Sequence, residues 1–255
     1  MMAKTRIKEN ERGLLFRYGD YARLLGPGEY RLWSRLWSPE SAQVLVVDTL
    51  KTRFEHPRLD VMLGDDAFRE AMVVVDLKDH ERALVWREGR LFAICGGGRH
   101  AFWRVPYALE VEVFDARHGR LEHDRLEAIV EHPGAATWLS VITVEPWQEV
   151  LLLRSGQLLD RLGAGRHVFW EGSGALTSTR TDLREQTLDV AGQEIMSADK
   201  VTLRLNLVVI YQVRDALIAL NQSGDCAKAL YREAQLALRA EVGSRSLDQL
   251  LSDKE

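Results

Sequence analysis

The stretch that decides the fold runs from Asp182 to Asp215 and reads Asp182-Leu-Arg-Glu-Gln-Thr-Leu-Asp-Val-Ala-Gly-Gln-Glu-Ile-Met-Ser-Ala-Asp-Lys-Val-Thr-Leu-Arg-Leu-Asn-Leu-Val-Val-Ile-Tyr-Gln-Val-Arg-Asp215. After a polar turn, apolar and polar residues alternate over residues 201–213, and this period of two predicts a β-strand. Val208 and Ile210 add apolar groups on the second face. We therefore expect the central strand of a sheet, covered on both sides.

Seven pieces of sequence surround this strand in a fixed order and spacing between residue 149 and residue 253. They are Glu149-Val-Leu-Leu-Leu-Arg-Ser-Gly156, Gly163-Ala-Gly165, Asp182-Leu-Arg184, Gln193-Glu-Ile-Met-Ser-Ala-Asp-Lys-Val201, Tyr211-Gln-Val-Arg-Asp215, Ala237-Leu-Arg239 and Leu247-Asp-Gln-Leu-Leu-Ser-Asp253. Together they resemble the SPFH superfamily (stomatin/prohibitin/flotillin, band 7), and most closely its stomatin and slipin branch. Two turns depart from the family pattern, because Ala191-Gly192 replaces a pair of prolines and Ala164 replaces the proline of Gly-Pro-Gly.

The resemblance implies a non-enzymatic scaffold whose SPFH domain continues into C-terminal helices and an oligomerising coiled coil. It also implies large homo-oligomers at the inner face of a membrane, which organise a microdomain or restrain partners such as membrane proteases. In the family a long helix begins near the end of this sequence, so we expect the natural chain to continue past Glu255.

The chain before residue 140 resembles the part after it when the sequence is compared with itself. Residues 11–19 match residues 81–89 at a shift of 70, and these match residues 148–156 at a shift of 67. Five positions are identical in three copies: Arg17/Arg87/Arg154, Gly19/Gly89/Gly156, Gly26/Gly96/Gly163, Gly28/Gly98/Gly165 and Trp33/Trp103/Trp170. We therefore expect an α+β chain of three tandem β-rich lobes, an SPFH-type β lobe at 1–70, a second at 71–138, and an SPFH (band 7) domain at 139–255.

Each repeat is expected to contain a strand, a turn at the first glycine, a second strand, a Gly-x-Gly turn and a third strand that ends in tryptophan. Glycines at fixed offsets between apolar runs are typical of turns, because they adopt positive φ at low cost. We expect the three tryptophans to be core residues and the three arginines each to pair with a carboxylate. Asp48, Asp115 and Asp182 also recur at intervals of 67 residues.

The pattern changes to a helical period after Asp215. Apolar residues recur at helical spacing from Cys226 to Val242, and Gly243 is expected to end this helix. Residues 246–249 then resemble a capping box that opens another helix. Its apolar side chains are candidate oligomer contacts: Leu247, Leu250 and Leu251.

Composition limits the functional classes. The net charge of -4 argues against nucleic acid as a partner. Two distant cysteines, Cys95 and Cys226, suit a reducing compartment and not a disulfide framework. The sequence contains neither a signal peptide nor a run of about 18 apolar residues, so we expect the N-terminal anchor common in stomatin-like proteins to be missing. We expect a protein on the cytoplasmic side, peripheral to the membrane.

Candidate chemical sites have simpler structural interpretations. Gly96-Gly-Gly98 could hold phosphate, but its repeat equivalents indicate a turn. The Glu-His pairs at 55–56, 122–123 and 131–132 could bind zinc, but two of them are repeat equivalents. His100 and His167 are equivalent to Tyr30, which suits a half-buried strand position. Since Cys95 aligns with two leucines, we expect a buried thiol, and we predict no catalytic residue, cofactor or metal.

The best candidate for membrane contact is the segment from Leu32 to Trp37, because Trp, Leu and Arg together suit a bilayer interface. Trp33 belongs to the repeat, so the candidates are Leu36 and Trp37. An alternative function is a soluble adaptor that binds one protein partner without lipid, favoured by the acidic balance and the lack of a membrane segment. A metal-dependent hydrolase built on the Glu-His pairs is a third, weaker hypothesis.

Overall fold

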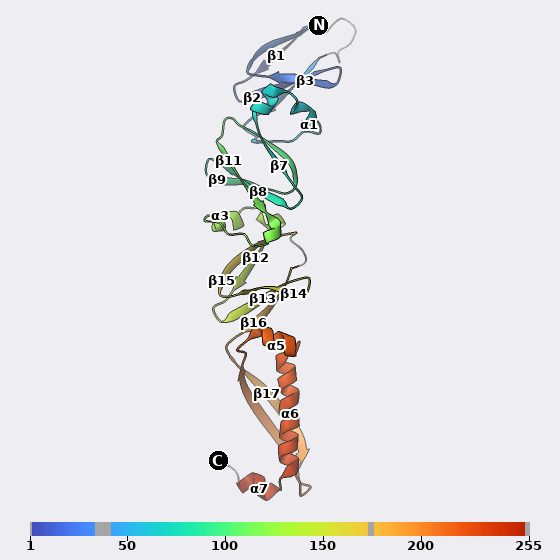
Figure 1. Ribbon diagram of the computed structural model, residues 1–255, viewed down its shortest axis with the longest axis vertical. Coiled ribbons are helices and arrows are strands. Elements are labelled where there is room, and N and C mark those ends of the chain that lie inside the picture. Colours follow the sequence, from blue (N-terminus) through green and yellow to red (C-terminus); the bar gives the residue numbers. More distant parts are fainter. Residues whose placement is uncertain (1, 34–41, 173–175, 253–255) are drawn as a thin grey trace. The chain divides into compact units, whose positions relative to one another are not determined.

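The computed structural model describes residues 2–33, 42–172 and 176–252 (Figure 1). The chain divides into two compact units. Unit 1 contains residues 1–140 together with 168–173, and unit 2 contains residues 141–167 together with 174–255. Strands dominate both units and the longer helices gather near the C-terminus, which agrees with the predicted α+β class.

The first part of the chain forms eleven strands and five short helical segments within the described residues. They are β1 (Met2–Ile7), β2 (Glu11–Arg17), β3 (Asp20–Leu25), β4 (Gly28–Trp33), β5 (Gln43–Asp48), β6 (Arg53–Phe54), α1 (Leu59–Met62), α2 (Asp66–Glu70), β7 (Met72–Leu77), β8 (Glu81–Arg87), β9 (Arg90–Cys95), β10 (Gly98–Trp103), β11 (Leu109–Asp115), η1 (Ala116–His118), α3 (Leu126–Val130) and α4 (Ala135–Trp138).

The second part contains the long hairpin and the longer helices. Its elements are β12 (Leu139–Val144), β13 (Gln148–Arg154), β14 (Gln157–Leu162), β15 (Gly165–Trp170), β16 (Leu176–Asp182), β17 (Glu185–Met196), β18 (Thr202–Gln212), α5 (Ala216–Gln222), α6 (Cys226–Ser244) and α7 (Leu247–Ser252).

Three antiparallel sheets have the same internal order. Their strand orders are β3-β2-β5, β9-β8-β11 and β14-β13-β16. In the first sheet Arg17 pairs with Asp20, so the loop between β2 and β3 is only Tyr18 and Gly19. Both loop residues have positive φ, 55° and 86°, as a type I′ turn requires. Equivalent pairs of positive φ occur at residues 88–89 and 155–156.

Among the described residues of unit 1, four apolar cores are each shared by neighbouring sheets. Strand β8 shows how the sharing arises, because successive side chains of a strand point to opposite faces. Leu84 and Trp86 belong to one core, whereas Ala83 and Val85 belong to another. In the same way, Leu14 and Leu15 of β2 enter different cores. These strands are therefore buried on both faces, and each sheet covers the next.

The tryptophans at the ends of β10 and β15 are both buried, as the sequence predicts. Trp103 packs with Phe54 of β6, which belongs to the same sheet, and with Phe68 of α2. Trp170 packs in the core that contains Leu84 and Trp86. The backbone repeats the arrangement: the amide of Trp103 donates to the carbonyl of Thr52 at 2.8 Å, and that of Trp170 to Gly119 at 2.7 Å. This packing explains why residues 168–173 belong to unit 1.

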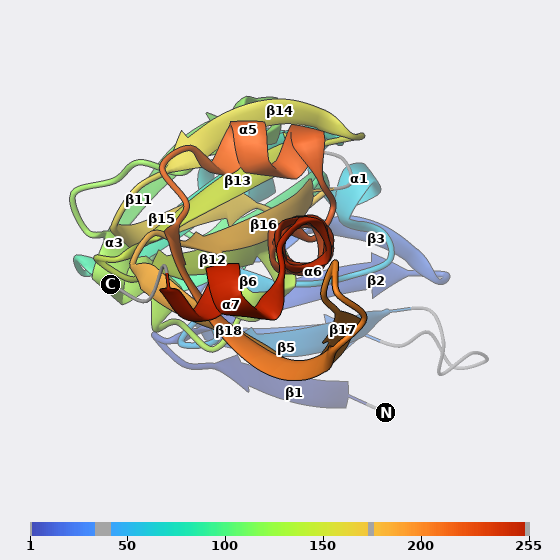
Figure 2. The same cartoon turned by 90° about the horizontal axis from the view of Figure 1, so that it is seen from below.

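The long hairpin of unit 2 differs from its sequence prediction. Strand β18 has the predicted period of two, but among the described strands it pairs only with β17, so it is not a central strand. Helix α6 packs against β17 and covers one face of the hairpin (Figures 1 and 2). The other face is exposed at Val208 and Ile210. Covering on both sides was therefore a wrong prediction for this strand within the chain.

Helix α6 begins as predicted but ends later than expected. Asp225 caps its first turn by accepting the amide of Lys228 at 3.0 Å. Gly243 lies inside the last turn, and the helix ends at Ser244 because Arg245 is extended. The carbonyl of Arg245 accepts the amide of Ala198 at 2.9 Å, so the end is set by a tertiary hydrogen bond and not by the glycine.

We expect Trp103→Ala to lower the free energy of unfolding of unit 1 by about 3–5 kcal/mol, because it removes a fully buried indole from a core that cannot collapse around the loss. Urea denaturation would measure the change. Trp147→Ala is the control, since Trp147 is 39% exposed and should cost about 1 kcal/mol or less. Equal losses in both variants would contradict the packing described for Trp103.

Candidate functional site

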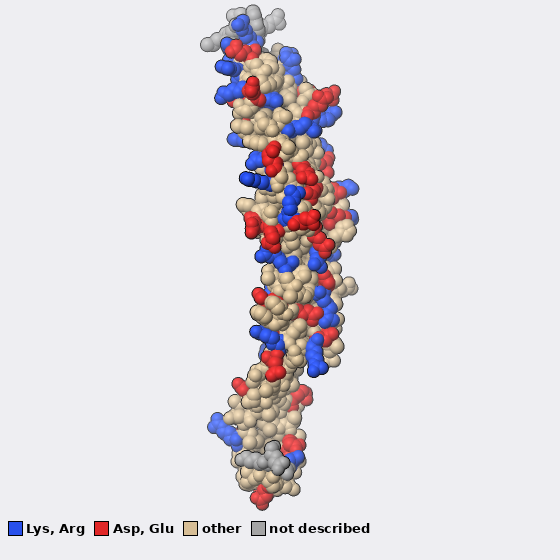
Figure 3. Space-filling view, turned by 90° about the vertical axis from the view of Figure 1, so that its left-hand side faces the viewer, with Lys and Arg blue, Asp and Glu red and all other residues tan. Residues whose placement is uncertain are grey.

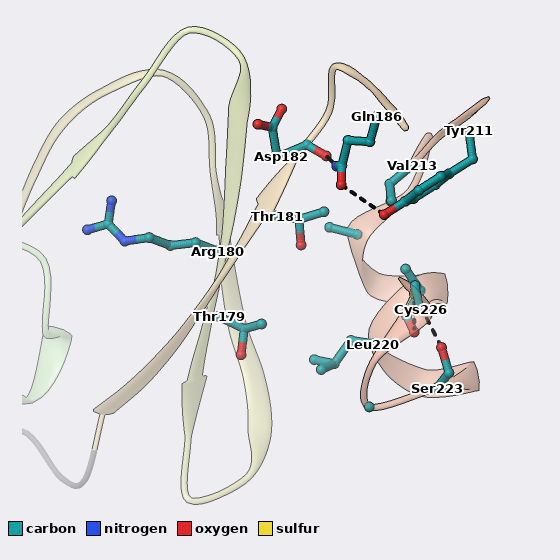
Figure 4. Close-up of a pocket in the computed structure, with 13 residues that line it drawn as sticks. Thr179, Arg180, Thr181, Asp182, Gln186, Tyr211, Val213, Leu220, Ser223 and Cys226 are labelled. Atoms are coloured by element: carbon teal, nitrogen blue, oxygen red, sulfur yellow. Dashed lines mark hydrogen bonds between the residues drawn. The ribbon is translucent and has the colours of Figure 1, made fainter. Parts of the chain in front are cut away.

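A small pocket in unit 2 lies between β16, the β17–β18 hairpin and the start of the C-terminal helices (Figure 4). Its volume is about 260 Å³. The pocket is lined by polar side chains of the strands and by Ser223 and Cys226 of the helical segment. Val213, Leu220 and three alanine or glycine residues complete the lining. Figure 4 shows Arg180 pointing away from the helices, so the wall is mainly hydroxyl, amide and apolar groups.

The polar groups of this pocket bind one another. The hydroxyl of Tyr211 donates to Gln186 Oε1 at 2.9 Å, and Gln186 Nε2 donates to the carbonyl of Asp182 at 3.2 Å. Ser223 Oγ donates to Cys226 Sγ at 3.3 Å. Because these donors and acceptors are paired with one another, the lining residues present no activated nucleophile beside a base.

The carboxylate of Asp182 is occupied by Arg184. Arg184 Nη2 lies 2.5 Å from Asp182 Oδ2 and Nε lies 3.0 Å from Oδ1. These side-chain hydrogen bonds, with the Arg184 amide, hold the pKa of Asp182 below its ordinary value. A carboxylate kept ionised in this way suits a structural turn and not a general acid.

The three Glu-His pairs all begin short helices. In each pair the histidine Nδ1 accepts the amide of the residue two positions on, which is the N-cap of α1, α3 or α4. The bonds are Arg58 N to His56 at 3.1 Å, Arg125 N to His123 at 2.9 Å and Gly134 N to His132 at 3.0 Å. Because an amide only donates, each Nδ1 carries no proton and is already occupied.

The glutamates of two pairs face away from their histidines. Glu55 pairs with Arg53 at 2.9 Å, and Glu122 pairs with Arg120 at 3.3 Å. His123 instead donates from Nε2 to Glu112 at 2.8 Å and stacks on Trp86. Within the described ranges, no group of three or more His, Cys, Asp or Glu side chains is placed to hold a metal ion.

His100 and His167 support the Gly-x-Gly turns, as does their repeat equivalent Tyr30. The three side chains reach back four residues to the carbonyl of the first glycine of the turn. The contacts are Tyr30 to Gly26 at 3.1 Å, His100 to Gly96 at 2.8 Å and His167 to Gly163 at 2.8 Å. The last glycines, Gly28, Gly98 and Gly165, have φ of 151°, 118° and 129°, which favours glycine there.

Within residues 2–33, 42–172 and 176–252, the three repeated arginines form no ion pair with a carboxylate, contrary to the sequence prediction. Arg17 is exposed at the end of β2. Arg87 lies over the rings of Phe92 and Tyr107, at 4.6 and 4.8 Å, and donates to Thr52. Arg154 has two buried guanidinium nitrogens without a hydrogen-bond partner in the described part of the chain. Cation–π stacking replaced the expected ion pair at Arg87 because its neighbours are aromatic.

The two cysteines are both free thiols. Cys95 is buried in a unit 1 core, as predicted, and burial raises the pKa of its thiol. Cys226 is half-buried at the start of α6 and lines the pocket.

The tip of the β17–β18 hairpin holds the start of α7. Both carboxylate oxygens of Asp199 accept the amide of Leu247 at 3.2 Å, and Ser197 Oγ donates to Asp199 at 2.5 Å. The predicted capping box is confirmed, since the Ser246 amide donates to Gln249 Oε1 at 2.9 Å. Asp199 was not among the predicted capping residues, although an aspartate in a tight turn, here Ser197-Ala-Asp-Lys200, typically accepts nearby backbone amides.

The candidate oligomer contacts lie on α7. Leu247 and Leu250 are half-buried, and Leu251 is 56% exposed. The candidate membrane residues Leu36 and Trp37 lie outside the described residues, and so does the side chain of Trp33. Among the helices that the structure describes, none has the length and apolar character needed to cross a bilayer.

Comparison with known proteins gives relatives for the C-terminal half. Residues 142–255 match the family model described as SPFH domain / Band 7 family. Mouse (Mus musculus) stomatin is 29% identical over 118 residues, which cover 46% of this chain and 42% of stomatin. Mechanosensory protein 2 of Caenorhabditis elegans is 29% identical over 117 residues, covering 46% of this chain and 24% of that protein. A stomatin homolog of Pyrococcus horikoshii is 31% identical over 112 residues, covering 44% and 41%.

These matches cover only part of each relative. The chain spans between about a quarter and under half of the length of these curated proteins. Residues 142–255 are a Band 7 (SPFH) domain with stomatin relatives, as the sequence motifs indicated.

We expect His123→Ala to destabilise unit 1 by about 1 kcal/mol, because the start of α3 loses its side-chain acceptor. Added zinc should leave the melting temperature of the parent unchanged, and metal analysis should find no stoichiometric zinc. His118→Ala is the control, since its ring is exposed and makes only a 3.3 Å contact with Asp115. A zinc-dependent rise in melting temperature that His123→Ala abolishes would revive the metal site.

We expect Asp199→Ala to increase amide hydrogen exchange in residues 247–252, because α7 loses the acceptor for its first amide. Hydrogen bonds from Ser197 and Leu247 hold the pKa of Asp199 below its ordinary value of 3.8. A lowered pKa stabilises the folded form above 3.8, so the parent should lose this protection only as the pH falls below that value.

Glu194→Ala removes the same charge from the outer face of β17 and is the control for Asp199→Ala. It should leave exchange in α7 unchanged. If both variants behave alike, Asp199 does not anchor the helix.

Proposed function

We propose that this chain, whose residues 142–255 form a Band 7 (SPFH) domain, is a stomatin-like scaffold that homo-oligomerises at the cytoplasmic surface of a membrane. There it would organise a membrane microdomain or regulate partner membrane proteins such as proteases. The match of residues 142–255 to the SPFH model, with stomatin among the relatives, carries this proposal.

A scaffold role agrees with the chemistry of the described residues. The polar groups of the unit 2 pocket bind one another, and the histidines that could hold a metal support helix starts and turns. These groups are therefore used to position chain segments. An assembly protein needs rigid surfaces and helices held in a fixed orientation. The hairpin tip fixes the start of α7, because Asp199 accepts the amide of Leu247.

We further propose that two extra SPFH-type β lobes, at 1–70 and 71–138, precede the SPFH domain at 139–255. The shared strand order of the three three-stranded sheets supports this proposal. Each middle strand also has a register shift at the equivalent place, after Leu15, Val85 and Leu152. Asp48, Asp115 and Asp182 each accept the amide two positions on at 2.9 Å. Repeated local hydrogen bonds of this kind are expected when one unit is copied.

In this proposal the first lobe supplies the contact with lipid. Leu36 and Trp37 are the residues that we assign to the bilayer interface, because tryptophan and leucine favour that region. A membrane-facing first lobe would then carry a C-terminal assembly domain. The alternative, a soluble adaptor that binds a protein partner without lipid, makes the opposite prediction for lipid binding.

We expect the 255-residue chain to float with liposomes of phosphatidylethanolamine and phosphatidylglycerol in a density gradient, and the Leu36→Ser/Trp37→Ser variant to remain at the bottom. Loss of two interfacial apolar side chains should reduce the bound fraction roughly tenfold or more. Circular dichroism would establish that the variant is folded.

The control is Leu50→Ser/Val61→Ser, which removes two exposed apolar side chains elsewhere in unit 1. This variant should float like the parent. If the parent itself does not float, the membrane-scaffold proposal fails for this chain and the soluble adaptor takes its place.

A further inference from the structure

The long hairpin of unit 2 leaves one edge of β18 open. Its eleven residues pair with β17 on one side, and within the described residues no strand pairs with the other side. An open edge of this length presents a row of unpaired amide and carbonyl groups that can accept another strand. A two-stranded sheet is also only marginally stable in water, so additional strands would stabilise the hairpin.

The sequence of β18 lacks the features that protect natural sheet edges. Protective features are charges, prolines and bulges on the edge strand. Arg204 is the one charged residue within Thr202–Gln212, and the register shift of this sheet lies in β17. By contrast, the edge strand β11 carries two glutamates and an aspartate, and β16 carries an arginine and an aspartate. Strand β18 therefore has the composition of an interior strand at an edge position.

The outer face beside this edge exposes two large apolar side chains of β18. Val208 is 58% exposed and Ile210 is 63% exposed, although both are in the middle of the sheet. Figure 3 shows one side of this part of the molecule with few charged side chains, whereas charges are dense over the preceding lobes. Exposed apolar groups next to an unpaired strand edge are typical of a surface that another chain covers.

We propose that β18 pairs with β18 of a second copy, antiparallel and about a two-fold axis that passes through Val208. The inference rests on the proposed function in so far as that function requires self-association. The inference goes beyond that function by naming the contact surface, the open edge of β18, and the register in which the two strands pair. The product is a continuous four-stranded sheet, β17-β18-β18-β17, with both α6 helices on the same face.

The register through Val208 keeps like faces together. Directly opposed residues of an antiparallel pair point to the same face, so apolar side chains of the α6 face meet one another. The three pairs, each given as one copy and then the other, are Leu207 with Val209, Leu205 with Tyr211 and Leu203 with Val213. On the outer face, Val208 meets Val208 at the axis.

The same register also balances charge. Within one copy Arg204 lies opposite Glu194, and Gln212 lies opposite Glu185. The two-fold pairing places Arg204 opposite Gln212 of the second copy. Each arginine then lies between its own Glu194 and the second copy's Gln212, with the second copy's Glu185 one strand further along the same row. A shift of the axis to Leu207 would place Arg204 opposite Ile210, so charge complementarity selects Val208.

The axis makes Val208→Cys a direct test of the proposal. All chains carry Cys226→Ser, so that only the buried Cys95 remains of the native thiols. Because the two Val208 positions face each other, mild oxidation of Val208→Cys should give a disulfide-linked dimer of the folded chain. Ile210→Cys is the matched control, since two Ile210 positions would be about 14 Å apart along the strands and cannot be bridged.

An equimolar mixture of Ile210→Cys and Asn206→Cys chains is a second test of the register. These two positions oppose each other across the axis, so the mixture should form the disulfide that neither chain forms alone. Equal cross-linking of Val208→Cys and Ile210→Cys, or none in Val208→Cys and in the mixture, would overturn the proposal.

Sedimentation of the reduced proteins separates this surface from the proposed function. Val208→Asp places like charges opposite each other on the axis and should weaken association by roughly tenfold. Val61→Asp, at a position that is 62% exposed in unit 1, should not. If the parent associates and Val208→Asp associates equally well, the scaffold proposal stands and this interface is wrong. If the parent is monomeric at every concentration, self-association itself is wrong.

Discussion

Cover on both faces of a β-strand is the constraint on which the rest of this structure depends. A strand places successive side chains on opposite sides, so a strand that is apolar at every position needs two cores. Strand β8 meets the need by giving Leu84 and Trp86 to one core and Ala83 and Val85 to another. Neighbouring sheets of unit 1 therefore cover and stabilise one another.

The tryptophans join successive sheets by the same means. Trp103 and Trp170 each end a strand and fill a core built mainly by residues earlier in the chain. A hydrogen bond from each tryptophan amide to the preceding segment fixes the strand where the indole enters. The boundary between units 1 and 2 consequently crosses β15, since Val168 and Trp170 contribute to a unit 1 core.

The β17–β18 hairpin of unit 2 is covered on only one of its two faces. Helix α6 covers one face, and the hairpin tip uses Asp199 and Ala198 to fix where α6 ends and α7 begins. The second face and one edge of β18 remain open in the described chain. In a Band 7 domain with stomatin relatives, we propose that assembly supplies the missing cover. The scaffold function would then follow from the same physical requirement as the fold.

Local patterns in the sequence determined the elements. Period two predicted β18, glycines at repeated positions predicted the turns, and Ser246 and Gln249 predicted the capping box. Ordered motifs predicted an SPFH domain at 139–255, where the family model matches residues 142–255. Each depends on neighbours within a few residues. Only the tertiary structure decided which groups these elements contact. Arg87 stacks on aromatic rings, and Arg245, not Gly243, terminates α6. Strand β18 lies at the edge of its sheet. The sequence pattern of an apolar strand is the same whether its own chain or another chain covers it. Alternation of apolar and polar residues shows that one face is buried, but it does not show which residues bury that face.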